Sequence, residues 1–264
     1  GEGAEGLVPN EFVELVAGSG PREERLLGRV SAQGDALLSL SHEPRVRPYN
    51  IRARNLQQRM ALELLLDDEV QLVTLVGQAG TGKTLLALAA GLHRVVKEEA
   101  YERVLVSRPI VPLGRDIGYL PGSKEAKLTT WMQPIFDNLE FLLRREAGQR
   151  RVNVDRRINE LLSSQLLQLE ALTYIRGRSI PGQYIIVDEA QNLTPHEVKT
   201  IISRAGEGSK VVLTGDPYQI DNPYLDSASN GLTYSAERFR GQRLAGHVML
   251  RRSERSTLAR PARP

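Results

Sequence analysis

The chain has 264 residues, of which 41% are hydrophobic and 25% charged, the composition of an ordinary soluble globular protein. It contains no cysteine, which excludes disulfides, thiolate metal sites and cysteine nucleophiles. No apolar stretch is long enough to span a bilayer and no signal segment opens the chain, so we expect a cytoplasmic protein without a membrane partner.

The net charge of +3 at pH 7 is modest, but the arginines are clustered. The stretch RREAGQRR (144–151) holds four of them, and YIRGRS (174–179) holds two more. Such clustering favours a polyanionic partner such as nucleic acid. A surface that only keeps the protein in solution is the alternative explanation.

Residues 1–50 contain short apolar pieces interrupted by Gly, Ser and Pro, with little helical periodicity. We expect two to four short strands there, forming a small β-rich appendage or linker. Pro44 and Pro48 precede a second unit, residues 51–264, in which apolar strand patterns alternate with helical ones. This alternation is typical of an α/β fold with a mostly parallel sheet covered by helices.

The helical patterns of the second unit carry start signals, since Asn55 and Thr194 are suitable N-caps and Pro195 suits a first helical position. The strand patterns are continuous apolar runs, as expected of strands buried on both faces. The expected helices lie at residues 51–69, 84–96, 130–147, 155–170 and 194–206, and the expected strands at 70–76, 103–109, 172–175, 184–187 and 210–215.

The stretch GQAGTGKT (77–84) matches the P-loop pattern G-x-x-x-x-G-K-[ST] and lies between an apolar strand and a helix. Its glycines let backbone N–H groups curl around a phosphate, and the helix N-terminus adds its dipole. Lys83 is expected to reach the β- and γ-phosphates of ATP, and Thr84 to place its hydroxyl on Mg²⁺. The expected nucleotide-binding residues of the loop are Gly77, Gln78, Ala79, Gly80, Thr81, Gly82, Lys83 and Thr84.

A second signal is IIVDEAQ (185–191), in which an apolar strand ends in two adjacent carboxylates. An unpaired buried charge is costly, so we expect the pair to meet a cation. Beside a P-loop, Asp188 is the natural carboxylate to complete the magnesium site. Glu189 is then placed to orient or deprotonate the attacking water. An N-cap Asp followed by a solvated Glu is the alternative interpretation.

Two glutamines are further candidates. Gln219 ends LTGDPYQ (213–219), a third strand exit, and its amide is expected to contact the γ-phosphate or the lytic water, although the segment is also a common turn. Gln57 lies on the helix before the first strand of the α/β unit, where paired amide hydrogen bonds would read adenine; Gln58 is beside it.

Together these segments resemble the PhoH-like ATPase family. The resemblance covers about residues 45–260, in the family's order, through RNLQQRMALELLLDD, the P-loop, RPIVPLGRDIGYLPGSKEAKLTTWMQPIFDNLE, ALTYIRGRSIPGQYIIVDEAQN, VVLTGDPYQID and HVMLRRSERSTLA. The segments RPIVPLGRDIGYLPG and YIRGRSIPGQYIIVDEAQNLTPHEVKT are far more specific than the P-loop, which many NTPases share.

The resemblance implies a single core similar to that of superfamily-one RNA and DNA helicases, with ATP and Mg²⁺ as cofactors. It makes Asp188 and Glu189 the Walker B pair, Gln219 the sensor, and Arg255 the late catalytic arginine. It also implies a homo-oligomer in the form of a hexameric ring. The N-terminal 50 residues are similar to the linker of the variant in which a PIN ribonuclease domain precedes the ATPase.

We therefore expect Mg-dependent ATP hydrolysis coupled to single-stranded RNA binding or remodelling, with RNA and DNA not distinguished by the sequence. An ATP-gated assembly module with little turnover and a small-molecule kinase are the alternatives. Because ligands of open α/β sheets sit where the strands exit, we expect nucleic acid at that edge. The candidate phosphate contacts are Arg108, Arg115, Lys124, Lys127, Arg176 and Arg178, with Tyr119 and Trp131 as stacking faces.

Overall fold

Six parallel strands form the main sheet, in the order β6-β5-β7-β8-β4-β9. The computed structural model describes residues 6–17, 24–40, 46–110, 131–148, 150–172 and 179–251, and these contain all six strands. The strands are β4 (Leu72–Gly77), β5 (Arg103–Arg108), β6 (Leu167–Ala171), β7 (Gln183–Val187), β8 (Lys210–Gly215) and β9 (Ala245–Leu250).

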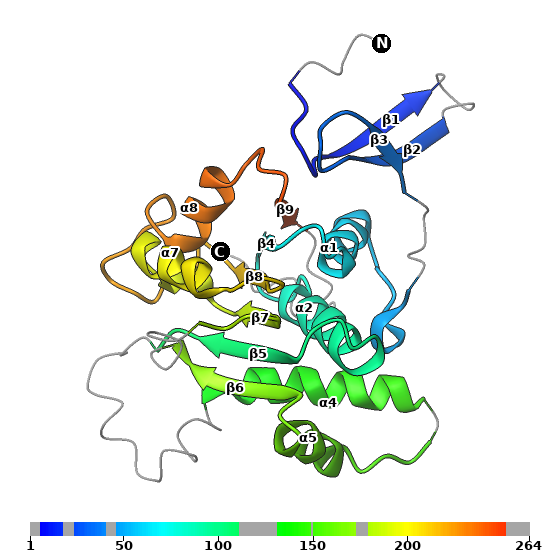
Figure 1. Cartoon of the computed structure of the whole chain (residues 1–264), viewed down its shortest axis with the longest axis vertical. Coiled ribbons are helices and arrows are strands. Elements are labelled where there is room, and N and C mark those ends of the chain that lie inside the picture. The colour runs from blue at the N-terminus through cyan, green and yellow to red at the C-terminus, as the bar shows by residue number, and fades with distance from the viewer. Residues whose placement is uncertain are drawn as a thin grey trace, which may run out of the picture.

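Helices cover both faces of this sheet, as Figure 1 shows. One face carries α1 (Leu56–Leu66), α2 (Lys83–Leu92), α4 (Gln133–Ala147) and α5 (Val154–Ser163). The opposite face carries α7 (Pro195–Arg204) and α8 (Gly231–Arg238). Short helical turns occur at η2 (Pro48–Asn50), η3 (His93–Lys97) and η5 (Ala190–Asn192). The predicted α/β fold with a mostly parallel, helix-covered sheet is confirmed.

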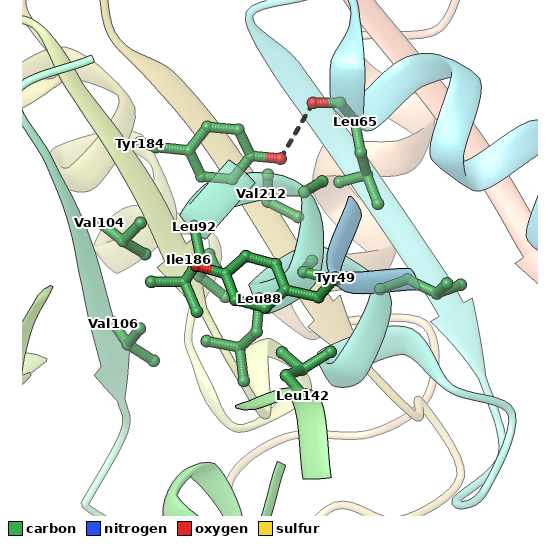
Figure 2. Close-up of a cluster of buried hydrophobic side chains, with 14 of the residues drawn as sticks. Tyr49, Leu65, Leu88, Leu92, Val104, Val106, Leu142, Tyr184, Ile186 and Val212 are labelled. Carbon is green, nitrogen blue, oxygen red and sulfur yellow. Dashed lines mark hydrogen bonds between the residues drawn. The ribbon is translucent and has the colours of Figure 1, made fainter. Parts of the chain in front are cut away.

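The core lies in two layers because the central strands are buried on both faces. Successive side chains of a strand point to opposite faces, so Ile186 packs on the α2 side and Ile185 on the α7 side. Figure 2 shows the layer on the α2 side, where Leu88 and Leu92 of α2 lie against the side chains of β5 and β7. None of the described helices has both the length and the apolar character needed to cross a membrane.

A second, antiparallel sheet is formed by β1 (Phe12–Ala17), β2 (Glu24–Val30) and β3 (Leu37–Ser39). It lies beside α1 and β9 (Figure 1) and matches the small β-rich unit expected near the N-terminus. Asn10 Nδ2 donates to the carbonyls of Arg243 and Ala245, at 2.8 and 2.9 Å. The buried Arg29 pairs with Asp67 at 2.6 Å. Polar contacts therefore tie the small sheet to the main sheet; the domain boundary at residue 50 stays a prediction.

Several elements differ from the sequence-based assignments. The helix expected at 155–170 ends at Ser163, and Gln165 takes a left-handed φ of 58° that no helix continues through. Strand β6, Leu167–Ala171, begins inside that expected helix and was not predicted. The strand expected at 172–175 falls almost entirely on residues outside the described ranges. Strand β9 and helix α8 were not predicted; β9 pairs with β4 at the sheet edge, and its side chains alternate between buried and exposed from Gly246 onward.

The C-terminal end of α1 is held by side chains of the sheet. Lys210, at the start of β8, is fully buried and its Nζ donates to the carbonyls of Leu64, Asp67 and Val70, at 2.8, 2.7 and 2.5 Å. The hydroxyl of Tyr184 donates to the carbonyl of Leu65 at 3.0 Å, the dashed contact in Figure 2. The last carbonyls of a helix have no partner within the helix, so these two side chains supply the missing donors.

We predict that Lys210→Met lowers the free energy of unfolding by about 2–4 kcal/mol, because buried carbonyls are left without donors. Urea unfolding followed by circular dichroism measures this difference. Lys199→Met, at an exposed lysine of α7 whose ammonium lies 5.4 Å from the ring centre of Tyr234, is the matched control. It is expected to change stability by about 1 kcal/mol or less. Equal stability of the two variants would contradict the capping role of Lys210.

Candidate nucleotide-binding and catalytic site

The P-loop joins the C-terminal end of β4 to the first turn of α2, where the sequence places it. Gly80 and Gly82 have φ angles of +81° and +91°, which side chains other than glycine rarely adopt. Thr81 Oγ1 donates to the carbonyl of Gln78 at 2.8 Å. The Lys83 ammonium donates to the carbonyls of Gly77 and Gln78. The loop is therefore closed on itself, with the predicted phosphate-binding lysine over its backbone.

Gly77 has a different reason to be glycine. A Cβ at this position would lie 2.3 Å from the carbonyl oxygen of Leu250 on β9. The absence of a side chain thus permits β9 to pair with β4 up to its last residue. The first glycine of the motif supports sheet packing here, while the later glycines shape the loop.

Asp188, the first residue after β7, lies at the centre of the site. It is 4% exposed, and one of its oxygens, Oδ1, accepts hydrogen bonds from Thr84 Oγ1 and Thr214 Oγ1, each at 2.7 Å. Its other oxygen, Oδ2, lies 3.2 Å from Nε of Arg108. Thr214 belongs to β8, whose register against β7 pairs Val187 with Leu213 and so sets Thr214 beside Asp188.

The donor set at Asp188 fits magnesium. In the part of the chain that the structure describes, no three acidic or histidine side chains gather into a metal site of their own. The protein ligands offered are one hydroxyl, from Thr84, and one carboxylate, from Asp188. Mg²⁺ is commonly held by one or two carboxylates together with substrate phosphates and water, so this pair is sufficient beside a triphosphate.

Glu189 follows Asp188 and adopts a left-handed backbone, with φ 58° and ψ 37°. This conformation is uncommon outside glycine and turns the chain sharply at the strand end. Its half-buried carboxylate accepts from Nε2 of Gln191. Burial, and then the neighbouring Asp188 charge, raise the pKa of Glu189 above its ordinary value. A carboxylate with a raised pKa is a better proton acceptor than an exposed one.

Gln191 is a site residue that our sequence analysis did not assign. It is completely buried. Besides contacting Glu189, its Nε2 donates to the carbonyl of Gln219 at 3.0 Å, and its Oε1 accepts from the backbone N–H of Asp216 at 3.1 Å. The predicted sensor segment is thus joined to Glu189 by one amide. Gln219 itself is exposed, and its sensor role stays a prediction.

The glutamine that lies against the P-loop is Gln58, the neighbour of the predicted Gln57. Gln58 Nε2 donates to the carbonyl of Thr81 at 3.0 Å, and its Oε1 accepts from the backbone N–H of Arg54 at 2.9 Å. Asn55 caps α1 by accepting from the N–H of Gln58, as predicted, which fixes the start of the helix. The adenine-reading role of Gln57 stays a prediction.

Arg108 is the predicted nucleic-acid contact whose position the structure gives. Its guanidinium lies at the carboxylate pair, with NH2 3.7 Å from Oε1 of Glu189 in addition to the contact with Asp188. The sequence analysis did not predict this pairing. The other predicted nucleic-acid contacts and the late arginine lie outside the described residues: Arg115, Lys124, Lys127, Arg176, Arg178 and Arg255.

A comparison with known families gives one decisive match. The sequence profile described as PhoH-like protein matches residues 50–261. The chain belongs to the PhoH family. Among relatives of this family, the protein PhoH2 of Bacillus subtilis strain 168 is 60% identical over 216 residues, which are 81% of this chain and 47% of that protein. The protein PhoH2 of Mycolicibacterium smegmatis is 43% identical over 212 residues, 80% of this chain and 46% of that protein.

The protein named PhoH-like protein, also of Bacillus subtilis strain 168, is 33% identical over 192 residues, which are 73% of this chain and 56% of that protein. The chain therefore spans about half the length of the curated PhoH relatives that it matches. A Pif1 helicase structure from Candida albicans is similar at 18% identity and a TM-score of 0.38, covering 76% of this chain and 40% of that one. That likeness is too remote to assign a function.

We predict that Gln58→Ala weakens nucleotide affinity about tenfold, or by about 1.4 kcal/mol, the effect of losing one hydrogen bond at the loop. Equilibrium titration with a fluorescent ATP analogue measures the dissociation constant. Gln71→Ala, at an exposed glutamine before β4, is the matched control and is expected to bind as the unaltered chain does. Gln57→Ala is titrated beside them as the separate test of the predicted adenine contact. Unchanged affinity in Gln58→Ala would contradict the role of Gln58.

Proposed function

We propose that this chain is a Mg-dependent ATPase that couples hydrolysis to the binding or remodelling of single-stranded RNA. The observation that carries the ATPase part is the hydrogen bond between Thr84 of the P-loop and Asp188 of β7, with Glu189 next in sequence. This contact joins the phosphate-binding loop to the carboxylate pair at the C-terminal ends of strands β4 and β7. Membership of the PhoH family, whose P-loop the chain contains in full, supports the same proposal.

Each residue has a separate task in the proposed reaction. The N–H groups of the loop and the Lys83 ammonium would bind the phosphates, leaving the carbonyls that Lys83 contacts in this structure. Thr84 and Asp188 would hold Mg²⁺, which when bound neutralises charge on the phosphate oxygens. Glu189 would accept a proton from the attacking water, and its raised pKa suits that role.

The nucleic-acid part of the proposal is supported by charge. The arginine clusters at 144–151 and 174–179 give the chain basic segments, and basic side chains bind the phosphate backbone. The relatives' names state no substrate, so RNA comes from the family resemblance described above. The hexameric ring, and a PIN ribonuclease domain in a longer protein, are proposals on the same ground. A cytoplasmic location is a proposal that rests on the sequence alone.

We predict that Glu189→Gln binds Mg·ATP but hydrolyses it ~10²–10⁴-fold more slowly, since the amide does not accept a proton. Asp188→Asn is expected to raise the magnesium concentration required for binding. Phosphate release and nucleotide titrations at several magnesium concentrations separate the two effects. Lys83→Ala, which removes the phosphate-binding ammonium, serves as the inactive reference. One common defect in both carboxylate variants would overturn this division of tasks.

We further predict that single-stranded RNA stimulates phosphate release and that its binding weakens steeply as salt is raised, because bound basic residues release counterions. Steady-state hydrolysis with and without an RNA oligonucleotide, at 50 and then at about 200 mM salt, tests both points. A DNA oligonucleotide of the same sequence distinguishes the two polymers. Hydrolysis that RNA leaves unchanged would favour the ATP-gated assembly module.

A further inference from the structure

Arg108 connects the catalytic carboxylates to a helix distant in sequence. It is the last residue of β5, and its side chain is 15% exposed. Nε lies 3.2 Å from Asp188 and NH2 3.7 Å from Glu189. The remaining nitrogen, NH1, donates to the backbone carbonyl of Trp131 at 2.9 Å. Trp131 precedes α4 by two residues, so one guanidinium spans from the Walker B pair to the start of α4.

The backbone fixes the first part of this connection. β5 and β7 run parallel with Ser107 opposite Val187, and the N–H of Asp188 donates to the carbonyl of Ser107 at 2.9 Å. The next residue of each strand is therefore Arg108 on one side and Asp188 on the other. Adjacent strand ends thus hold the two charges together. The closeness of Arg108 to Asp188 therefore follows from the strand register and not from the chance position of a flexible surface side chain.

The contacts of Arg108 differ in quality. The bond to the Trp131 carbonyl has good length, whereas Nε is buried without an aligned hydrogen-bond acceptor, although Asp188 lies at ion-pair distance. The contact with Glu189 is longer still. A charge contact without hydrogen-bond alignment holds its partner less firmly than a two-pronged arginine–carboxylate bond. Arg108 is therefore near the carboxylates but not locked to them.

Arg108 and a magnesium ion held by Thr84 and Asp188 would be competing cations at the same carboxylate. Oδ1 of Asp188 already accepts from two hydroxyls, one of them from Thr84, and Oδ2 faces Arg108. Like charges at short range repel, most strongly where water is excluded. A cation held by Thr84 and Asp188 would thus push the guanidinium away from Oδ2. Since the same group donates to Trp131, that displacement would be felt at the start of α4.

We propose that Arg108 is a positioning residue that occupies the Asp188–Glu189 pair before Mg·nucleotide binds and, when displaced, changes the contact at Trp131 and so signals occupancy of the site to α4. This inference rests on the proposed ATPase function. It assigns Arg108 a role at the nucleotide site, in addition to the nucleic-acid contact that remains a prediction. It also gives the reason for the guanidinium fork, because an ammonium has no second arm for the Trp131 carbonyl.

The first test measures competition. Binding of a non-hydrolysable ATP analogue is titrated at increasing Mg²⁺ for the unaltered chain, Arg108→Gln and Arg108→Lys. Removing the rival cation is expected to lower the half-maximal Mg²⁺ concentration by about 5-fold or more in Arg108→Gln, the lower range of coupling between two ligands. Arg108→Lys keeps the charge and is expected to stay near the unaltered value. A higher or unchanged Mg²⁺ requirement in Arg108→Gln would overturn the proposal.

The second test measures the connection to α4. Trp131 is the chain's single tryptophan, so its emission reports this position alone. Mg²⁺ with the analogue is expected to change the emission of the unaltered chain, and neither component alone to do so. Both Arg108 variants should lose this change while still binding the analogue. Trp131→Phe keeps the carbonyl and removes the signal, which confirms its origin.

Arg103→Gln, at the opposite end of β5, is the matched control and should behave as the unaltered chain in both tests. If Arg108→Gln does not fold, the unaltered chain still tests the proposal. No change in Trp131 emission with Mg²⁺ and analogue together would refute the connection between the nucleotide site and α4. Failure of the proposed function is a separate outcome, because it appears as an unaltered chain that does not bind or hydrolyse Mg·ATP. Emission changes that persist in both Arg108 variants would also refute the role of Arg108.

Discussion

The buried carboxylate of Asp188 is the constraint on which the rest of this structure depends. A carboxylate that is 4% exposed must be compensated by donors and cations. Here the donors come from the start of α2 and the end of β8, and the cation from the end of β5. Their convergence requires the central strand order and register that the sheet has. Replacing any of these partners would leave a buried charge with fewer contacts, a costly change.

The parts of the protein that the sequence predicted correctly are those in which local pattern and chemistry agree. The P-loop motif, with an apolar strand before it and a helical pattern after it, predicts the order strand, loop and helix that β4 and α2 form. The strands before Asp188 and after Lys210 are apolar enough to require burial on both faces. The α/β class follows from their alternation with helices. The hydroxyl of Thr84 donates a hydrogen bond to Asp188. The P-loop motif and the carboxylate pair together predicted that these two residues lie close to each other.

The parts that the sequence did not predict depend on partners remote in the chain. β9 is an edge strand whose side chains are only partly buried, so its pattern is weak until β4 pairs with it. The contact of Gln58 with the P-loop depends on the rotation of α1, which its cap and its packing fix. Arg108 faces Asp188 because β5 and β7 are neighbours in space, though about 80 residues separate the two. The register of β5 against β7 cannot be read from a single sequence.

The anchoring of α1 at both ends has a mechanical consequence. At its first turn Gln58 contacts the P-loop, and at its last turn Lys210 and Tyr184 fasten it to the sheet. Just beyond that end Asp67 pairs with Arg29 of the small sheet. The helix has 11 residues and so a length of about 16 Å. The helix is a rigid element with a contact at each end. A displacement of the small sheet would therefore be transmitted along α1 to the P-loop.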